Sequence, residues 1–354
     1  MKTAKPLHCN GLAVLDERIY SADKIELELM IGEESRMKKK LLGNTGIEVS
    51  VAGFGVLPMG PSQLALPVEE GAALISYALS HGMNFIDTAQ YYRTYPYIRK
   101  ALEYGDFDDV VICSKSLCND YAGMMEAIAE AREALNREVI DIFLMHEVRS
   151  GQLELRSGAW QALLDAKKKG LVRAVGLSTH HVDVTKAAAA MEDLDVVFPL
   201  INYAGLGIRK GDAFATREEM MEAIAECHCA GKGVFSMKAF GGGSLTCDYQ
   251  KALDYVFSKP EIDSVMIGFG KLAEIDDLLN YLNGSMEPTY NPDVSKKKVY
   301  VNQEDCEGCG ACKAACPAGA IFYNENGLAE VDHEKCLTCG YCSPVCPVRA
   351  VIMY

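Results

Sequence analysis

Residues 140–146 are IDIFLMH, a short apolar run that ends in a histidine. Short runs rich in β-branched and aromatic residues predict buried β-strands. Seven more runs of this kind follow one another through the middle of the chain, at residues 51–56, 84–89, 110–115, 172–178, 196–202, 233–238 and 263–268. The sequence therefore predicts a set of eight regularly spaced strands.

Segments with the period of an amphipathic helix lie between these strands, and several end in glycine, a common residue at a helix C-terminus. Eight strands that are each followed by a helix, over about 250 residues, predict an α/β fold of the (β/α)8 TIM-barrel type. A doubly wound sheet alternates in the same way, but eight regular units favour closure. The active site of such a barrel lies at the C-terminal ends of its strands.

The whole chain has 354 residues, enough for one large domain and a smaller one. We expect a loosely ordered extension at 1–36, the barrel at 37–283, a linker rich in Pro, Gly, Asn and Ser at 284–298, and a cysteine-rich domain at 299–354. Two short apolar runs joined at Asn44-Thr45-Gly46 predict a hairpin before the first strand.

The net charge of −14 argues against nucleic acid or an anionic membrane as a partner. No apolar run approaches the ~18 residues of a membrane span, and the N-terminal run GLAVL is too short for a signal peptide. We therefore expect a cytoplasmic protein. Of its 14 cysteines, six show no repeated spacing and are expected to be free thiols; Cys227 and Cys229 are a weaker candidate for a metal pair.

The other eight cysteines form one motif written twice, C-x2-C-x2-C-x3-C-P, in CEGCGACKAACP (306–317) and CLTCGYCSPVCP (336–347). This motif resembles that of the bacterial two-cluster ferredoxins, which have a small α+β fold and bind two [4Fe–4S] clusters through soft thiolate ligands. The resemblance implies that the fourth cysteine of each motif binds the other cluster. One ligand set is then Cys306, Cys309, Cys312 and Cys346, and the other is Cys336, Cys339, Cys342 and Cys316. Two structural zinc sites are the alternative, although zinc needs neither the third regular step nor the proline.

Four of the predicted strands end in polar side chains, which are Asp87, Lys115, His146 and Ser178. A structural ion pair between Asp87 and Lys115, with His146 as a core residue, would be one explanation. The stretches around them, with others in the same order, resemble the aldo-keto reductase family: LGNTGIEVSVAGFG, FIDTAQYY, SK at 114–115, DIFLMH, VRAVGLST and GGG at 241–243.

The resemblance implies a catalytic tetrad of Asp87, Tyr92, Lys115 and His146, in which Tyr91 is the neighbour that could be confused with Tyr92. Tyr92 would be the proton donor. Lys115, held by Asp87, would lower the pKa of the phenol, and His146 would orient the substrate oxygen.

A nicotinamide cofactor is also implied by the resemblance. Ser178 would contact its carboxamide, Gly241, Gly242 and Gly243 would let the backbone approach the pyrophosphate, and Gly268 and Lys271 lie in the loop that would recognise phosphate. Two positions depart from the family pattern. Phe198 stands where many relatives have Gln, and Glu274 stands where NADP-specific members have Arg, which favours NADH over NADPH.

We therefore expect an oxidoreductase that reduces a small aldehyde or ketone, or oxidises an alcohol, and that carries an electron-transfer domain with a possible redox partner protein. The alternative is an electron-transfer protein or redox sensor whose barrel is inactive or binds another cofactor such as flavin. The sequence does not predict the substrate, the direction of reaction or the coupling between two-electron hydride chemistry and one-electron clusters.

Overall fold

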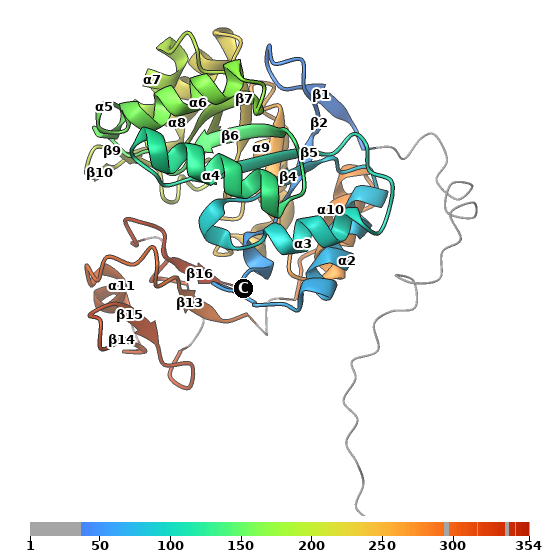
Figure 1. The fold of residues 1–354 in the computed structure, drawn as a ribbon. Coiled ribbons are helices and arrows are strands. Elements are labelled where there is room, and N and C mark those ends of the chain that lie inside the picture. Colours follow the sequence, from blue (N-terminus) through green and yellow to red (C-terminus); the bar gives the residue numbers. More distant parts are fainter. Residues whose placement is uncertain (1–36, 294–296, 317, 337–339, 344, 354) are drawn as a thin grey trace, which may run out of the picture. The chain divides into compact units, whose positions relative to one another are not determined.

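Eight parallel strands close into a barrel in the computed structural model (Figure 1), which describes residues 37–293, 297–316, 318–336, 340–343 and 345–353. The strands are β3 (Ala52–Gly55), β4 (Phe85–Asp87), β5 (Val111–Ser116), β6 (Ile140–Met145), β7 (Val172–Thr179), β8 (Val196–Pro199), β11 (Gly233–Ser236) and β12 (Ser264–Gly268). Pairing follows chain order, and β12 closes the ring on β3. Each strand falls within one of the eight predicted runs or within a residue of it, so the predicted TIM barrel is confirmed. The predicted extension at 1–36 lies outside the described residues.

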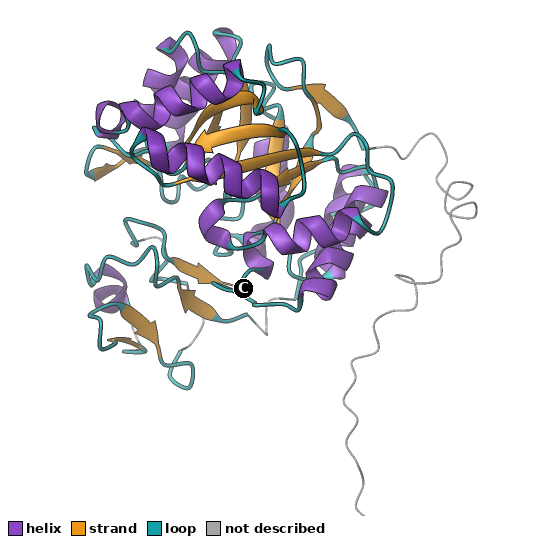
Figure 2. Ribbon diagram, viewed as in Figure 1, coloured by secondary structure: helices purple, strands orange, loops and turns teal. Residues whose placement is uncertain are grey.

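A helix follows each barrel strand, and Figure 2 shows the helices around the strands. They are α2 (Val68–Ser80), α3 (Tyr95–Leu102), α4 (Tyr121–Ala134), α6 (Ser157–Lys168), α7 (Val182–Ala190), α8 (Arg217–Cys229), α9 (Tyr249–Phe257) and α10 (Leu272–Leu282), with the short α5 (Gln152–Leu155) before α6. Helix α8 starts with a capping box between Thr216 and Glu219. Near its end Cys227 is buried and its thiol donates to the Thr185 carbonyl, whereas Cys229 is exposed, so the two thiols do not form a shared site.

The predicted hairpin is present as β1 (Lys39–Leu41) and β2 (Glu48–Ser50), which pair antiparallel. Buried side chains from this hairpin belong to the same apolar cluster as side chains of the barrel interior: Leu42, Ile47, Val49, Phe85, Val111, Cys113, Ile142, Leu144, Ala174, Val196, Phe198, Phe235 and Met266. The hairpin thus packs against the interior of the barrel. A second hairpin, β9 (Arg209–Lys210) with β10 (Ala213–Phe214), was not predicted.

The alternation of side chains along each strand determines which polar residues face inward. In β5, Val111 and Cys113 belong to the interior cluster, whereas Ile112 packs in the layer between strands and helices. Because successive side chains of a strand point to opposite faces, Lys115 faces the interior as well. The same argument places His146 inward, two residues after the interior Leu144.

The C-terminal domain is built on two small antiparallel pairs and one short helix. Strand β13 (Val299–Val301) pairs with β16 (Val351–Met353), and β14 (Ile321–Tyr323) pairs with β15 (Ala329–Val331). Helix α11 (Ala311–Ala315) lies between β13 and β14 in the chain. Its apolar core is small and includes Cys312, Cys342 and Cys346. Among the described residues of the whole chain, no helix is long and apolar enough to cross a membrane.

Candidate active site at the barrel mouth

A buried ion pair lies at the C-terminal ends of β4 and β5. The Lys115 ammonium donates to Asp87 Oδ1 and to the Thr88 carbonyl, each at 2.6 Å, and both charged side chains are almost fully buried. Burial raises the pKa of Asp87, while the charge and hydrogen bond of Lys115 lower it. The two residues of the predicted tetrad that were expected to pair are therefore in direct contact.

Tyr92 ends the short 3-10 helix η4 (Gln90–Tyr92), which follows β4. Its hydroxyl lies 3.3 Å from Nε2 of His146, and the Lys115 Nζ lies 5.0 Å from the centre of its ring. The structure thus brings all four predicted tetrad residues together in one buried group. Tyr91, the neighbour in the sequence, makes a different contact: its hydroxyl donates to Asp305 Oδ1 at 3.1 Å.

The pKa of Tyr92 does not follow the expectation from the sequence, which was that Lys115 would lower it. Burial raises this pKa well above the usual value of a phenol, and the neighbouring Asp87, Tyr91, Asp305 and Glu147 raise it further. Two of these groups, Asp305 and Glu147, were not considered in the sequence analysis. Tyr92 is therefore a protonated phenol, able to donate a proton but reluctant to remain a phenolate.

The backbone of His146 is held by hydrogen bonds, whereas its ring contacts Tyr92 through one nitrogen. Burial lowers the pKa of its imidazole well below the usual value, and the positive charges of Lys115, Arg156 and Lys238 lower it further, so the ring is neutral. Nδ1 of the ring has no hydrogen-bond partner among the described residues.

Arg156 is a positioning residue that the sequence analysis missed. It is 3% exposed, and its guanidinium donates to the carbonyls of His146 (2.7 Å), Ser116 (3.0 Å) and Cys118 (3.1 Å). It thereby ties together the ends of β5 and β6, from which Lys115 and His146 project. A lone arginine between two helical segments carries no sequence signal for this role.

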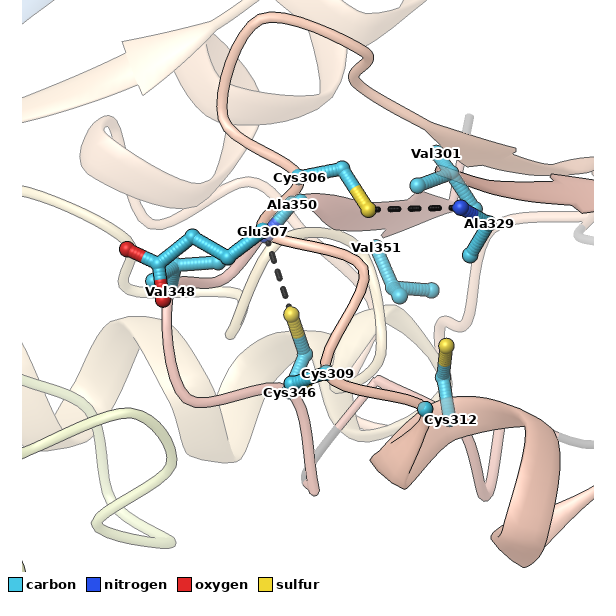
Figure 3. Close-up of a pocket in the computed structure, with 11 residues that line it drawn as sticks. Val301, Cys306, Glu307, Cys309, Cys312, Ala329, Cys346, Val348, Ala350 and Val351 are labelled. Atoms are coloured by element: carbon cyan, nitrogen blue, oxygen red, sulfur yellow. Dashed lines mark hydrogen bonds between the residues drawn. The ribbon is translucent and has the colours of Figure 1, made fainter. Parts of the chain in front are cut away.

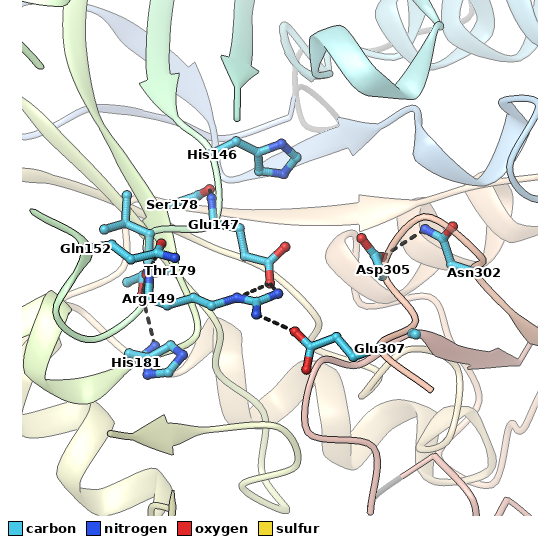
Figure 4. A network of polar contacts seen from close by, with 12 residues as sticks. His146, Glu147, Arg149, Gln152, Ser178, Thr179, His181, Asn302, Asp305 and Glu307 are labelled. Carbon is cyan, nitrogen blue, oxygen red and sulfur yellow. Dashed lines mark hydrogen bonds and ion pairs between the residues drawn. The ribbon is translucent and has the colours of Figure 1, made fainter. Parts of the chain in front are cut away.

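A polar network continues from the barrel to the C-terminal domain (Figure 4). The Ser178 hydroxyl accepts the Glu147 backbone N–H at 2.8 Å, so the residue predicted to contact the carboxamide is buried at the mouth. Arg149 donates to Glu147 Oε1 at 3.1 Å and to Glu307 Oε1 at 2.6 Å. Asp305 accepts from Asn302 and from Tyr91. The C-terminal domain thus places the carboxylates of Asp305 and Glu307 against side chains of the barrel mouth.

The three glycines predicted to approach a pyrophosphate lie against the C-terminal part of the chain. Arg349 donates to the Gly241 carbonyl, the backbone N–H of Met353 donates to the Gly242 carbonyl at 3.0 Å, and Lys297 donates to the Gly243 carbonyl at 3.1 Å. The pyrophosphate end of the predicted cofactor site is therefore covered by the protein itself.

Gly268 and Lys271, the other two residues predicted to bind the cofactor, lie just before α10. Gly268 ends β12, and Lys271 is the exposed N-cap residue of α10. Glu274 accepts the Gly270 backbone N–H at 2.8 Å. Phe198, which takes the place of the expected Gln, is buried and stacks on Phe235 with 4.3 Å between ring centres.

Four cysteines of the C-terminal domain line one hollow (Figure 3). Cys306, Cys309 and Cys312 come from the first motif, and Cys346 comes from the second. The other residues that line the hollow are Val301, Glu307, Gly310, Ala329, Val348, Ala350 and Val351. Backbone N–H groups of Ala329 and Ala350 donate to the sulfurs of Cys306 and Cys346 at 3.4 and 3.2 Å. This is the first ligand set that the ferredoxin resemblance implies, and N–H donors to sulfur are usual around iron–sulfur clusters.

The second set is described in part, because Cys339 lies outside the described residues. Burial raises the pKa of the Cys342 thiol to about 11, and the charges of Cys312, Cys316 and Cys336 also raise it, so these sulfurs are neighbours. The Ala320 N–H donates to the Cys316 sulfur at 3.3 Å. Cluster binding would replace the thiol protons, and because the ligands come from separate segments of a small domain, it would be coupled to the folding of that domain.

Comparison with known proteins agrees with both the barrel and the cysteine-rich domain. Residues 53–254, more than half of the chain, match the model of the aldo/keto reductase family, and residues 298–353 match the 4Fe-4S dicluster domain. The chain is 22% identical to L-galactose dehydrogenase of Arabidopsis thaliana over 69% of this chain and 87% of that protein. It is 25% identical to methylglyoxal reductase DkgA of Yersinia pestis over 56% of this chain and 73% of that protein.

Solved structures share the barrel. A chain from Pseudomonas aeruginosa described as an aldo-keto reductase superposes with a TM-score of 0.59 at 21% identity, covering 73% of this chain and 100% of that one. An aldo-keto reductase of Bombyx mori, solved in complex with NADP, superposes with a TM-score of 0.53 at 16% identity, covering 70% of this chain and 88% of that one. At these identities the likeness establishes the fold alone.

Proposed function

Because the chain belongs to the aldo/keto reductase family and is therefore an oxidoreductase, we propose that it reduces a small aldehyde or ketone, or oxidises the corresponding alcohol, at the barrel mouth. The observation that carries this proposal is the contact between the Tyr92 hydroxyl and His146, beside the buried Lys115–Asp87 pair. A proton donor, a neutral imidazole and a fixed ammonium are the groups that carbonyl reduction requires.

Each residue then has a defined part. A bound nicotinamide would supply or accept the hydride. Tyr92 donates its proton to the carbonyl oxygen, and its raised pKa keeps the proton in place until the oxygen becomes basic. Nε2 of His146, 3.3 Å from the phenol oxygen, lies close enough to contact the same substrate oxygen. The positive charge of Lys115, which Asp87 holds in place, stabilises the negative charge that forms on Tyr92.

The cofactor and substrate classes are drawn from the relatives and from the site. Family membership and the NADP complex of the Bombyx mori neighbour support a nicotinamide cofactor. The Glu274 carboxylate next to Lys271 would repel a 2′-phosphate, which favours NADH over NADPH. The relatives named methylglyoxal reductase and L-galactose dehydrogenase support a small, oxygen-rich substrate.

The cluster domain adds one-electron chemistry to this reaction. The converging cysteines and the 4Fe-4S dicluster match support iron–sulfur clusters, which we propose number two. Their electrons would be exchanged with a redox partner protein. We propose that the Asp305 carboxylate, which this domain brings to the barrel mouth, adds to the burial and to the Asp87 charge that raise the pKa of Tyr92.

The test is the substitution Tyr92→Phe in anaerobically purified protein, assayed with NADH and NADPH against small aldehydes including methylglyoxal. Loss of the proton donor is expected to lower kcat by about 10²–10⁴-fold. Tyr91→Phe is the matched control, because it removes a neighbouring hydroxyl that bonds Asp305 instead, and should retain most activity. If both variants lose activity to the same extent, or if neither loses activity, the role assigned to Tyr92 is wrong.

A further inference from the structure

The triglycine loop, residues 241–243, is a docking surface within this chain. Its three carbonyls accept hydrogen bonds from Arg349, from the Met353 backbone N–H and from Lys297. The Lys297 ammonium also donates to the Thr246 hydroxyl. The linker end and the cluster domain therefore hold successive peptide groups of one barrel loop.

Close approach of β16 explains why this loop needs glycine. A Cβ on Gly243 would lie 1.9 Å from the Met353 carbonyl oxygen, and a Cβ on Gly242 would lie 3.3 Å from Arg349 Nη2. All three glycines also have positive φ, between 57° and 88°. The feature that predicted a pyrophosphate site in the sequence is here occupied by protein backbone.

Two of the backbone N–H groups that a pyrophosphate would need are already bonded to carbonyls next to the loop. The Gly241 N–H donates to the Lys238 carbonyl at 2.8 Å, and the Gly243 N–H donates to the Phe240 carbonyl at 3.0 Å. A phosphate group binds backbone N–H groups that point at it. The loop must therefore be both uncovered and rearranged before it can hold a dinucleotide.

Further contacts fix the cluster domain over the mouth. Arg93 pairs with Glu304, and Arg149 pairs with Glu307 at 2.6 Å. Among the described residues, six that are not glycine have positive φ, and four of them take part in or adjoin this contact: Arg93, Glu147, Lys238 and Arg349. Such conformations are strained and persist where surrounding contacts hold them. Their clustering shows that the contact between barrel and cluster domain holds the backbone in unfavourable conformations.

We propose that the docked cluster domain and a nicotinamide dinucleotide compete for the triglycine loop, so that the dinucleotide binds only when the cluster domain is released. This inference rests on the nicotinamide dependence proposed above. Apparent affinity for the dinucleotide is then the intrinsic affinity reduced by the fraction of molecules that are undocked. By linkage, saturating dinucleotide must favour release of the domain.

The test weakens docking from the cluster-domain side, without touching the loop or the tetrad. Glu304→Gln and Glu307→Gln remove two exposed ion pairs with side chains of the same shape. The Kd for NADH, titrated by fluorescence in full-length anaerobic protein of verified iron content, should fall by about threefold for each pair removed. Glu226→Gln removes an exposed pair with Lys186 on the barrel helices, and should leave the Kd unchanged.

Hydrogen exchange supplies a readout that is independent of activity. The Met353 N–H, bonded to Gly242, should exchange faster in the double variant and in the parent protein saturated with NADH. Equal Kd values in all variants, with exchange at Met353 unaffected by NADH, would overturn the competition alone. If exchange shows the domain released and neither NADH nor NADPH binds, the nicotinamide dependence falls, and the competition with it.

Discussion

Substituting Lys115 tests whether the pair at the barrel mouth is a buried ion pair. Lys115→Met keeps the length of the side chain and removes its charge, which leaves Asp87, 6% exposed, without the ammonium that bonds it at 2.6 Å. Removing one partner of a buried pair costs about 3–5 kcal/mol. For a domain of this size each kcal/mol lowers Tm by about 2–4 °C, so the expected fall is about 6–20 °C.

The loss should depend on pH, with a sign that follows from the pKa of Asp87. Burial raises this pKa and Lys115 lowers it, so the substitution raises it further. A carboxyl whose pKa is higher in the folded than in the unfolded state gains protons on folding. Its contribution to stability is complete below the unfolded pKa, about 4, and is lost as pH rises through the folded value. The gap between Lys115→Met and the parent should therefore be wider at pH 8 than at pH 5.

The single tryptophan of the chain makes the assay specific to the barrel. Trp160 lies in α6, so its fluorescence during thermal unfolding reports the barrel and not the cluster domain. The double variant Lys115→Met/Asp87→Asn has no stranded charge, and should recover part of the lost Tm and lose the extra pH dependence. A single variant equally destabilised at both pH values, with no recovery in the double variant, would refute the assignment of a buried ion pair.

Two further predictions concern the cluster domain. Asp305→Asn removes a charge that raises the pKa of Tyr92, so the alkaline limb of the pH profile of kcat/KM should move to lower pH; an unmoved limb would show that Asp305 and Tyr92 are not coupled. Cys346→Ala and Cys316→Ala should each leave about four of about eight irons per chain, with a different electron paramagnetic resonance signal lost in each. Loss of the same signal in both, or zinc in place of iron, would contradict the crossed ligand sets.

Local patterns explain why the barrel could be predicted from the sequence. Runs such as 140–146 are apolar because both faces of a barrel strand are buried, and the polar residue that ends each run marks the mouth. The tetrad positions followed from those strand ends together with the family resemblance. The inward orientation of Lys115 and His146 follows only from the structure, because strand alternation is counted from the interior residues Cys113 and Leu144.

The contacts that modify the site could not be predicted in the same way, because they join segments far apart in the chain. Tyr91 and Asp305 are 214 residues apart, and no local sequence pattern predicts their hydrogen bond. Without it, the sequence suggested a lowered pKa for Tyr92, whereas burial and the nearby carboxylates raise it. The triglycine loop shows a second limit: glycine is required equally for a pyrophosphate and for a docked strand, so composition does not distinguish them.

The inward alternation of β5 also restricts how this barrel can change in length. Deleting one residue between Val111 and Lys115 would turn Lys115 towards the helix layer and bring an apolar neighbour to the mouth, because strand side chains alternate. Insertions in the loops beyond the strand ends would leave that orientation unchanged. When relatives of about 22% identity are aligned with this chain, gaps therefore belong in the loops, and an alignment that opens one inside β5 misplaces the lysine.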